Sequence, residues 1–185
     1  SEMFDALRGP LVALREQALA RTQSAAITGH FPKHQQLELG QHIAQVFGYD
    51  GSRGRMDLAV HPFCSGSGND VRVTTRVDES EPLGCIYSVI HEVGHAAYEQ
   101  NIHPDFGFTP AGTGCSMGVH ESQSRIYENQ LGRSRAFTGW LFGELKDRFG
   151  DFGIKDEDEF YQAVNAVKNG FIRTEADELQ YNLHV

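Results

Sequence analysis

The sequence predicts a mainly α-helical fold with a small antiparallel β-sheet, which places the protein in the α+β class. Apolar residues recur at helical spacing over most of the chain, and they alternate with polar residues in two short central segments. The chain has 185 residues, of which 39% are hydrophobic. That length suits one domain with an ordinary hydrophobic core, and the composition excludes a mostly disordered chain.

Two helices are expected before residue 50. The first carries an apolar series at helical spacing, which Pro10 interrupts near its start: Leu7, Leu11, Leu14 and Ala18. The second follows Pro32, and Gly48 is placed to end it. The apolar face of this second helix consists of Leu37, Ile43, Ala44 and Phe47.

The two alternating segments, residues 56–61 and 70–77, are expected to be β-strands. Residues 64–69 between them are turn formers, so we expect a loop that joins the two strands as an antiparallel pair. In the second strand the valines share one face, and the other face is polar: Asp70, Arg72, Thr74 and Arg76. Such a face is usually solvated, although it can also line a cleft.

Helical spacing returns after Pro82, where an apolar stripe consists of Leu83, Ile86, Ile90, Val93 and Ala97. A glycine-rich loop is predicted at residues 109–114, and further helices at residues 119–131, 135–149 and 157–169. The sequence T-E-A-D at residues 174–177 has the form of a capping box that begins another helix. Because Val185 would cut this helix short, we expect the chain to be a fragment of a longer protein.

Charge and cysteine content exclude several classes of function. The net charge of −9 disfavours binding to a nucleic-acid backbone. The longest purely apolar run, residues 11–14, is far shorter than a bilayer span, so no membrane partner is expected. The three widely spaced cysteines form neither a disulfide framework nor a zinc knuckle, which predicts a reducing, cytoplasmic compartment.

The motif H-E-V-G-H at residues 91–95 carries the clearest chemical signal. On a helix, His91 and His95 are about 40° apart in projection, so both imidazoles can bind one metal ion. Glu92 lies beside them, where it can reach a metal-bound water. Gly94 is unfavourable inside a helix, so we expect another segment to pack closely against it. The motif also occurs by chance in helices that bind no metal.

A catalytic zinc site needs a third protein ligand, and Glu121 is the best candidate. It follows His95 by 26 residues, at the start of the next predicted helix. His120 is an alternative ligand, although its direction on a helix differs from that of Glu121 by roughly 100°. His30 and His34 are a weaker pair, because the intervening proline disfavours a continuous helix. No nucleophile elbow, P-loop or Rossmann glycine pattern is present in the sequence.

Five motifs occur in a recognisable order: H-P-F at 61–63, D-V-R-V-T at 70–74, H-E-V-G-H at 91–95, H-E-S-Q at 120–123 and I-R-T-E-A-D-E-L-Q-Y at 172–181. With them the chain resembles the M32 family of zinc metallocarboxypeptidases, the carboxypeptidase Taq type. Gln180 departs from the threonine that the family usually carries, which puts substrate preference in doubt.

The resemblance implies a gluzincin-like fold, with a small sheet beside the active-site helix. Family members are much longer, so residues 1–185 are expected to be a single catalytic-core segment, truncated at both ends. Residues 1–50 would be a helical lead-in and residues 51–185 the zinc-site core. Homodimers are implied for the intact protein.

The resemblance also implies a mechanism. Zinc, for which cobalt is a possible substitute, would be held by His91, His95 and Glu121, with Glu92 as general base for a metal-activated water. Tyr181 would stabilise the oxyanion that forms on the scissile carbonyl.

A peptide with a free C-terminus is the expected substrate, and arginine suits recognition of its carboxylate. Arg173 is the choice that the resemblance implies, and Arg72 is the second. Arg72 can equally form a structural ion pair with Asp70, which together with Thr74 is expected to organise the cleft. His61 is expected to hydrogen-bond the substrate or the oxyanion, or otherwise to end its strand. Asp177 caps a helix by default, or supports a zinc histidine.

Two other functions remain open at this stage. Related gluzincins share the H-E-x-x-H motif, so an endo-oligopeptidase is one alternative. A zinc-binding module without catalysis is the other, because the flanking segments of the family are missing from this chain.

Overall fold

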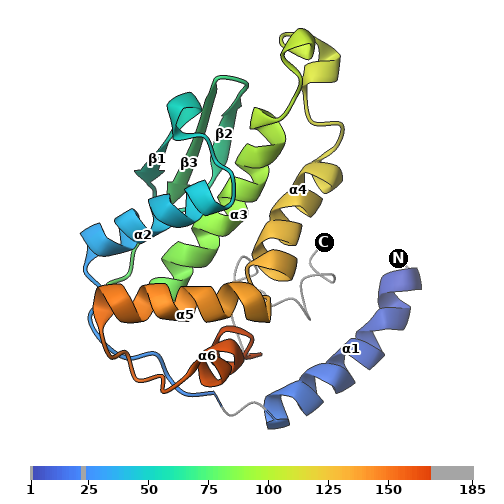
Figure 1. The fold of residues 1–185 in the computed structure, drawn as a ribbon. Coiled ribbons are helices and arrows are strands. Elements are labelled where there is room, and N and C mark those ends of the chain that lie inside the picture. The colour runs from blue at the N-terminus through green and yellow to red at the C-terminus, as the bar shows by residue number, and fades with distance from the viewer. Residues whose placement is uncertain (1, 22–23, 168–185) are drawn as a thin grey trace.

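The structure is a computed structural model that describes residues 2–21 and 24–167 (Figure 1). In chain order its main elements are α1 (Glu2–Arg21), α2 (Lys33–Val46), β1 (Gly54–Leu58), β2 (Cys64–Ser67), β3 (Asp70–Thr75), α3 (Pro82–Gln100), α4 (Met117–Arg125), α5 (Arg135–Phe149) and α6 (Glu157–Val164). Short 3-10 turns lie at Gly51–Arg53, Pro104–Phe106 and Pro110–Gly112, and a π-helical segment, Ile126–Leu131, continues α4. The mainly helical fold with a small sheet is therefore confirmed.

The small sheet is mixed, and the prediction of an antiparallel pair was wrong in its pairing. The strand order is β1-β3-β2: β1 runs parallel to β3, and β2 runs antiparallel to it. The first predicted strand ends at Leu58 rather than at residue 61, because the chain bends at residues 60–61 before β2 begins. A third strand therefore lies where a loop was expected.

Glycine explains why β2 resembles a loop in sequence. Gly66 has a positive φ of 101°, and a Cβ atom there would lie within 1.9 Å of the carbonyl oxygen of Asp70. Gly68, with a φ of 58°, forms part of the turn into β3. The tight hairpin thus requires small residues that are also typical of loops.

Helix α3 lies at the centre of the structure, with the sheet on one side and α4 on the other (Figure 1). The prediction of a single apolar stripe underestimated its burial. Val89, Val93 and Ala96 pack with the valines of β3, whereas Ile86 and Ile90 pack with residues of α2, α5 and α6. The helix is therefore covered on several sides, and it links the two hydrophobic clusters of the core.

The remaining helices follow the sequence prediction with two exceptions. Helix α4 begins at Met117, two residues before the predicted start, and passes into the π-helical segment at Ile126. Helix α5 has the predicted bounds, and the Ser134 side chain caps it by accepting a hydrogen bond from the N–H of Phe137. Helix α6 ends at Val164 rather than at residue 169. The side chain of Asn165 donates to the carbonyl oxygens of Tyr161 and Arg133, so it ends the helix at that point.

Helix α1 continues through Pro10 as a helix of 20 residues, none of which is buried. The predicted capping box at residues 174–177 and the motif at residues 172–181 lie outside the described residues. No helix in the described ranges has the length and apolar character needed to span a bilayer.

Candidate metal centre

The first half of the centre lies on α3. Pro82 occupies the first turn of this helix, and the Glu81 carboxylate caps it by accepting hydrogen bonds from the N–H groups of Leu83 and Gly84. The helix is regular through residues 91–95, so His91 and His95 lie on the same side of it. Their ring centroids are 5.0 Å apart.

The second half lies on α4, which packs closely against α3 at Gly94. A Cβ atom on Gly94 would lie only 2.6 Å from the Cα atom of Ser124. The expectation that another segment packs against Gly94 is therefore confirmed. This contact lets Glu121, one turn before Ser124, approach the two histidines.

His91, His95 and Glu121 form a group that can hold a metal ion, with ligand atoms within 4.8 Å of one another. The Glu121 Oε2 atom lies 3.2 Å from His95 Nε2 and 3.7 Å from His91 Nε2. The single hydroxyl hydrogen of Ser124 is shared between the Glu121 carbonyl oxygen, 2.7 Å from Oγ, and the same carboxylate oxygen, 3.1 Å from Oγ. Two imidazole nitrogens and one carboxylate oxygen are a donor set that suits a catalytic zinc ion.

His91 is supported on its other nitrogen by Glu128, in the π-helical segment. Its Nδ1 atom lies 2.9 Å from Glu128 Oε2, which also accepts a hydrogen bond from Arg125 at 2.8 Å. Arg133 approaches the other oxygen of the same carboxylate at 3.5 Å. Burial alone would raise the pKa of Glu128, but the His91 hydrogen bond and the arginine charges hold that pKa below its usual value.

Glu128 in turn acts on the titration of His91. Burial lowers the pKa of His91, but the hydrogen bond and charge of Glu128, helped by Glu92 and Glu121, hold that pKa above its usual value.

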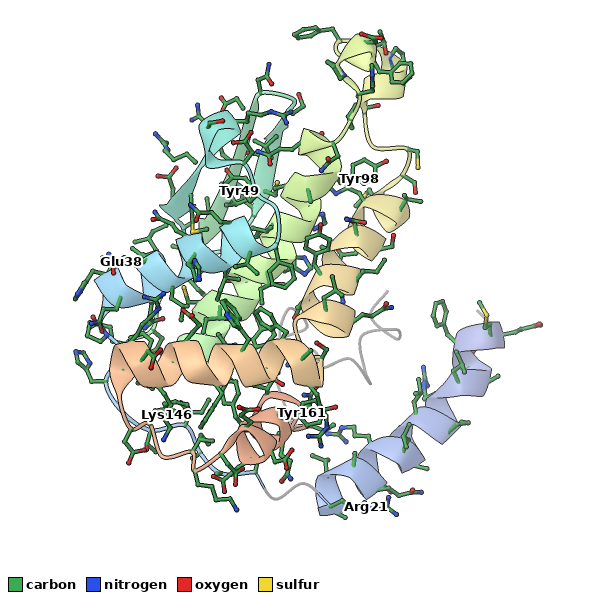
Figure 2. The ribbon with its side chains drawn as sticks, in the orientation of Figure 1. Arg21, Glu38, Tyr49, Tyr98, Lys146 and Tyr161 are labelled. Atoms are coloured by element: carbon green, nitrogen blue, oxygen red, sulfur yellow. The ribbon has the colours of Figure 1, made fainter. Side chains whose placement is uncertain are left out.

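His95 is supported through a second histidine. Its Nδ1 atom lies 2.7 Å from Nδ1 of His120, and Nε2 of His120 lies 2.8 Å from Glu99 Oε1. Tyr98, on the part of α3 that faces α4, places its ring 4.7 Å from the His120 ring (Figure 2). His120, the alternative ligand, thus contacts the Nδ1 edge of His95 and lies outside the three-residue group.

Glu92 points away from solvent, with only 7% of its surface exposed. Burial raises its pKa, the positive charges of His91 and His95 would lower it, and the neighbouring carboxylates raise it further. The group therefore holds a proton more readily than an exposed glutamate does.

The predicted substrate residues on the sheet lie in different environments. The Arg72 Nε and Nη2 atoms each donate to Asp70 at 2.9 Å, so the expected ion pair is present. Thr74 is buried, and its Oγ1 accepts a hydrogen bond from the N–H of Phe63, which ties the H-P-F segment to β3. His61 is exposed in the bend between β1 and β2, three residues beyond the end of its strand.

Arg173, Asp177, Gln180 and Tyr181 all lie outside the described residues. Two residues near the centre, Glu99 and Glu128, were not predicted from the sequence. A signal for each was present, since Glu99 follows His95 by one helical turn and Glu128 follows Glu121 by two. Glutamates on helices are so common at these spacings that the pattern alone does not distinguish them.

A helix that carries two histidines one turn apart, packed between a small sheet and a helix that supplies a carboxylate, defines the zincin-like class of metallopeptidase folds. Comparison with known proteins identifies one family within this class. The family model for the carboxypeptidase Taq (M32) metallopeptidases matches residues 1–185. The chain belongs to this family.

Relatives in sequence and structure agree with this assignment. The chain is 41% identical to "Carboxypeptidase 1" of Bacillus subtilis over all of its own length and 38% of that protein. It is 36% identical to "Thermostable carboxypeptidase 1" of Pyrococcus furiosus, again over 38% of the relative. The crystal structure of the M32 carboxypeptidase from Deinococcus radiodurans matches 99% of this chain and 38% of its own, with 46% identity and a TM-score of 0.90. The chain thus spans about two fifths of the length of the relatives it matches.

Proposed function

We propose that this chain is the zinc-binding catalytic segment of a carboxypeptidase that removes residues from the C-terminus of peptides. The observation that carries the proposal is the approach of His91, His95 and Glu121 to within 4.8 Å of one another, with the buried Glu92 between the two histidines in sequence. Membership of the carboxypeptidase Taq (M32) family supports the same conclusion.

The donor set fits zinc. His91 and His95 would bind the ion through Nε2 and Glu121 through a carboxylate oxygen, which leaves a further coordination position open, as catalytic zinc sites require. Cobalt is a possible substitute, because imidazole and carboxylate ligands also suit it. The bound ion supplies Lewis-acid chemistry for the hydrolysis of a peptide bond.

Glu92 is the proposed general base. Its carboxylate takes the proton from the attacking water and then passes it to the departing amine nitrogen. Burial keeps this carboxylate away from bulk solvent, so the proton is retained between the two steps. Tyr181 is the proposed donor to the developing oxyanion, as the family resemblance implies.

Recognition of a free C-terminus is assigned to arginine. Asp70 pairs with the Nε–Nη2 edge of Arg72, and the guanidinium has a second edge, Nη1–Nη2, that suits a carboxylate. Arg173 is the second candidate, and His61 is a proposed hydrogen-bond partner of the substrate. In this proposal Asp70 orients Arg72, which reconciles the structural pairing with a role in binding.

The test compares a peptide that ends in a free carboxylate with the same peptide amidated at its C-terminus. With zinc added we expect stepwise loss of C-terminal residues from the free acid, no cleavage of the amide, and no cleavage of either after chelation. Internal cleavage of both peptides would favour an endo-oligopeptidase.

Stoichiometric zinc without any cleavage would favour a zinc-binding module without catalysis. A specific observation motivates that second candidate, since the chain matches only about two fifths of the relatives' length. Zinc content by elemental analysis therefore accompanies the peptide assay.

A further inference from the structure

The contact between His95 and His120 is an in-plane hydrogen bond rather than ring stacking. The two Nδ1 atoms are 2.7 Å apart, whereas the ring centroids are 4.8 Å apart and the ring planes differ by 25°. Stacked rings with that centroid separation would hold their nitrogens well beyond hydrogen-bond distance. The rings therefore meet edge to edge, and one of the two Nδ1 atoms donates to the other.

Glu99 determines which nitrogen donates. An ionised carboxylate can only accept, so the hydrogen shared with Glu99 at 2.8 Å belongs to Nε2 of His120. A neutral imidazole carries one N–H, which leaves Nδ1 of His120 as an acceptor. His95 must then donate from its own Nδ1, and in a neutral His95 this leaves Nε2, which lies 3.2 Å from Glu121 Oε2, without a hydrogen and able to bind a metal ion.

The surroundings hold His120 in this orientation. The Tyr98 ring lies 4.7 Å from the His120 ring, and a Cβ atom on Gly114 would lie 3.1 Å from the His120 Cδ2 atom. Glu99 and His120 are both largely covered, with 15% and 23% of their side chains exposed. The chain of hydrogen bonds is therefore shielded from competition with water.

The two metal-centre histidines are thus supported by unequal means. Glu128 contacts His91 directly, and that carboxylate is also paired with Arg125 and Arg133. Within residues 2–21 and 24–167, no carboxylate contacts the Nδ1 atom of His95, which is linked to Glu99 through the His120 ring.

We propose that His120 and Glu99 are positioning residues, which hold His95 in the single tautomer whose Nε2 atom can bind a metal ion. The inference rests on the proposed function, because it concerns the same metal centre. It assigns to this chain a two-step link in which the Glu99 carboxylate contacts the His120 imidazole, and that imidazole contacts the ligand histidine.

The first test reads the tautomers by two-bond ¹H–¹⁵N NMR correlation in the metal-free protein. We expect a hydrogen on Nδ1 of His95 and on Nε2 of His120. In E99A, which leaves the His95–His120 contact itself intact, we expect His95 to become a mixture of tautomers. An unchanged His95 tautomer in E99A would overturn the proposal, and this readout does not depend on metal binding.

The second test measures zinc affinity by competition with a chelator. H120F keeps a ring against Tyr98 but removes both hydrogen bonds, so we expect zinc to bind about 10- to 100-fold more weakly. E99A should approach that loss, and E99Q, whose amide oxygen still accepts, should lose less. H34F, on the exposed side of α2, is the matched control and should bind zinc as the unmodified chain does.

The results separate the two proposals. Zinc binding that is the same in H120F, E99A and the unmodified chain would overturn the positioning role and leave the proposed function intact. Failure of the unmodified chain to bind zinc would overturn the metal centre itself, even if the tautomers are as expected. If H120F does not fold, the E99A and E99Q pair decides the question, since neither alters a ring in the centre.

Discussion

Gly94 and Ser124 are the point at which α3 and α4 come so close that no side chain fits between them. A Cβ atom on Gly94 would lie 2.6 Å from the Ser124 Cα atom and 3.1 Å from the carbonyl oxygen of Gln123. Both obstructing groups are backbone, so they cannot move aside as a flexible side chain would. The approach of Glu121 to His91 and His95 therefore depends on a residue that has no side chain.

We predict that G94A lowers the free energy of unfolding by about 1–3 kcal/mol, because the added methyl group separates two packed helices. Zinc affinity should fall as well, since α4 carries Glu121. G143A is the matched control: Gly143 lies in α5, and no atom of the described residues lies within 4 Å of an added Cβ atom, so this change should stabilise by about 0.5–1 kcal/mol. Urea denaturation measures both values, and equal stability of the two variants would contradict the prediction.

We predict that E92Q reduces peptide hydrolysis by about 10²- to 10⁴-fold while zinc stays bound, because the amide cannot accept the proton of the attacking water. Single-turnover hydrolysis and elemental analysis measure the two quantities. E38Q, an exposed position on α2 (Figure 2), is the control and should keep full activity. Hydrolysis that survives in E92Q would show that another group is the base.

We predict that E128A costs about 3 kcal/mol of folding stability, because it removes the shared acceptor of His91, Arg125 and Arg133 from a largely covered site. D57A is the comparison. The Arg55–Asp57 ion pair is exposed, so its loss should cost at most about 1 kcal/mol. Thermal unfolding of the metal-free variants is the measurement. Similar losses of stability in E128A and D57A would contradict the role of Glu128 as a largely covered acceptor that three side chains share.

We predict an alkaline loss of stability that involves Tyr49. Its hydroxyl donates to the Val71 carbonyl oxygen at 2.6 Å, and burial, with a smaller effect of Cys64, raises its pKa to about 12. A tyrosine in the unfolded chain ionises near pH 10. Because the folded pKa is the higher one, the contribution of Tyr49 is complete below about pH 10 and is lost as the pH rises towards 12.

Stability measured as a function of pH tests this in the unmodified chain and in Y49F. The variant should lose about 1 kcal/mol at neutral pH with its hydrogen bond. It should also show a shallower decline between pH 10 and 12. An equally steep decline in Y49F would assign the alkaline transition to other groups.

We predict that Cys115 reacts with iodoacetamide before Cys64 and Cys85 at pH 8. Burial, with the charges of Glu92 and Glu99, raises the pKa of the Cys64 thiol to about 12, and burial also raises the pKa of Cys85. Only the thiolate reacts, so both should be slow while the exposed Cys115 is modified first. Peptide mass mapping over time gives the order, and unfolding in urea should abolish it. Early labelling of Cys64 in the folded protein would contradict its environment in β2.

Much of the fold could be predicted because it depends on local patterns. The bounds of α5 and the start of α6 follow from apolar spacing and from the capping residues Ser134 and Asp156, which act within one helical turn. The central position of α3 was harder to predict from the sequence. Its apolar stripe was read correctly, but the burial of Val89 and Ala96 depends on a sheet that packs against the second face.

The pairing of the strands could not be predicted from the sequence. A pair joined by turn formers is usually antiparallel, but the turn at Gly68 joins β2 to β3, and β1 pairs with β3 from the other side. Nothing in the residues of β1 specifies a parallel partner. In the folded chain the sheet packs against α3, and Ala44 of α2 lies in the same cluster as the valines of β3.

By itself, the amino-acid sequence indicated the family and the helix that carries His91 and His95, because the spacing of two residues on a helix is a property of a few neighbouring residues. It also marked Glu121 as a candidate third ligand, although the approach of Glu121 to the histidines depends on the packing of α4 against α3. Only the tertiary structure decided that His120 contacts the Nδ1 atom of His95. It also decided that Glu99 contacts His120 and that Glu128 contacts His91. The position of a hydrogen on an imidazole depends on what lies within 3 Å of it. Those neighbours come from other turns and other helices, which only the folded chain brings together.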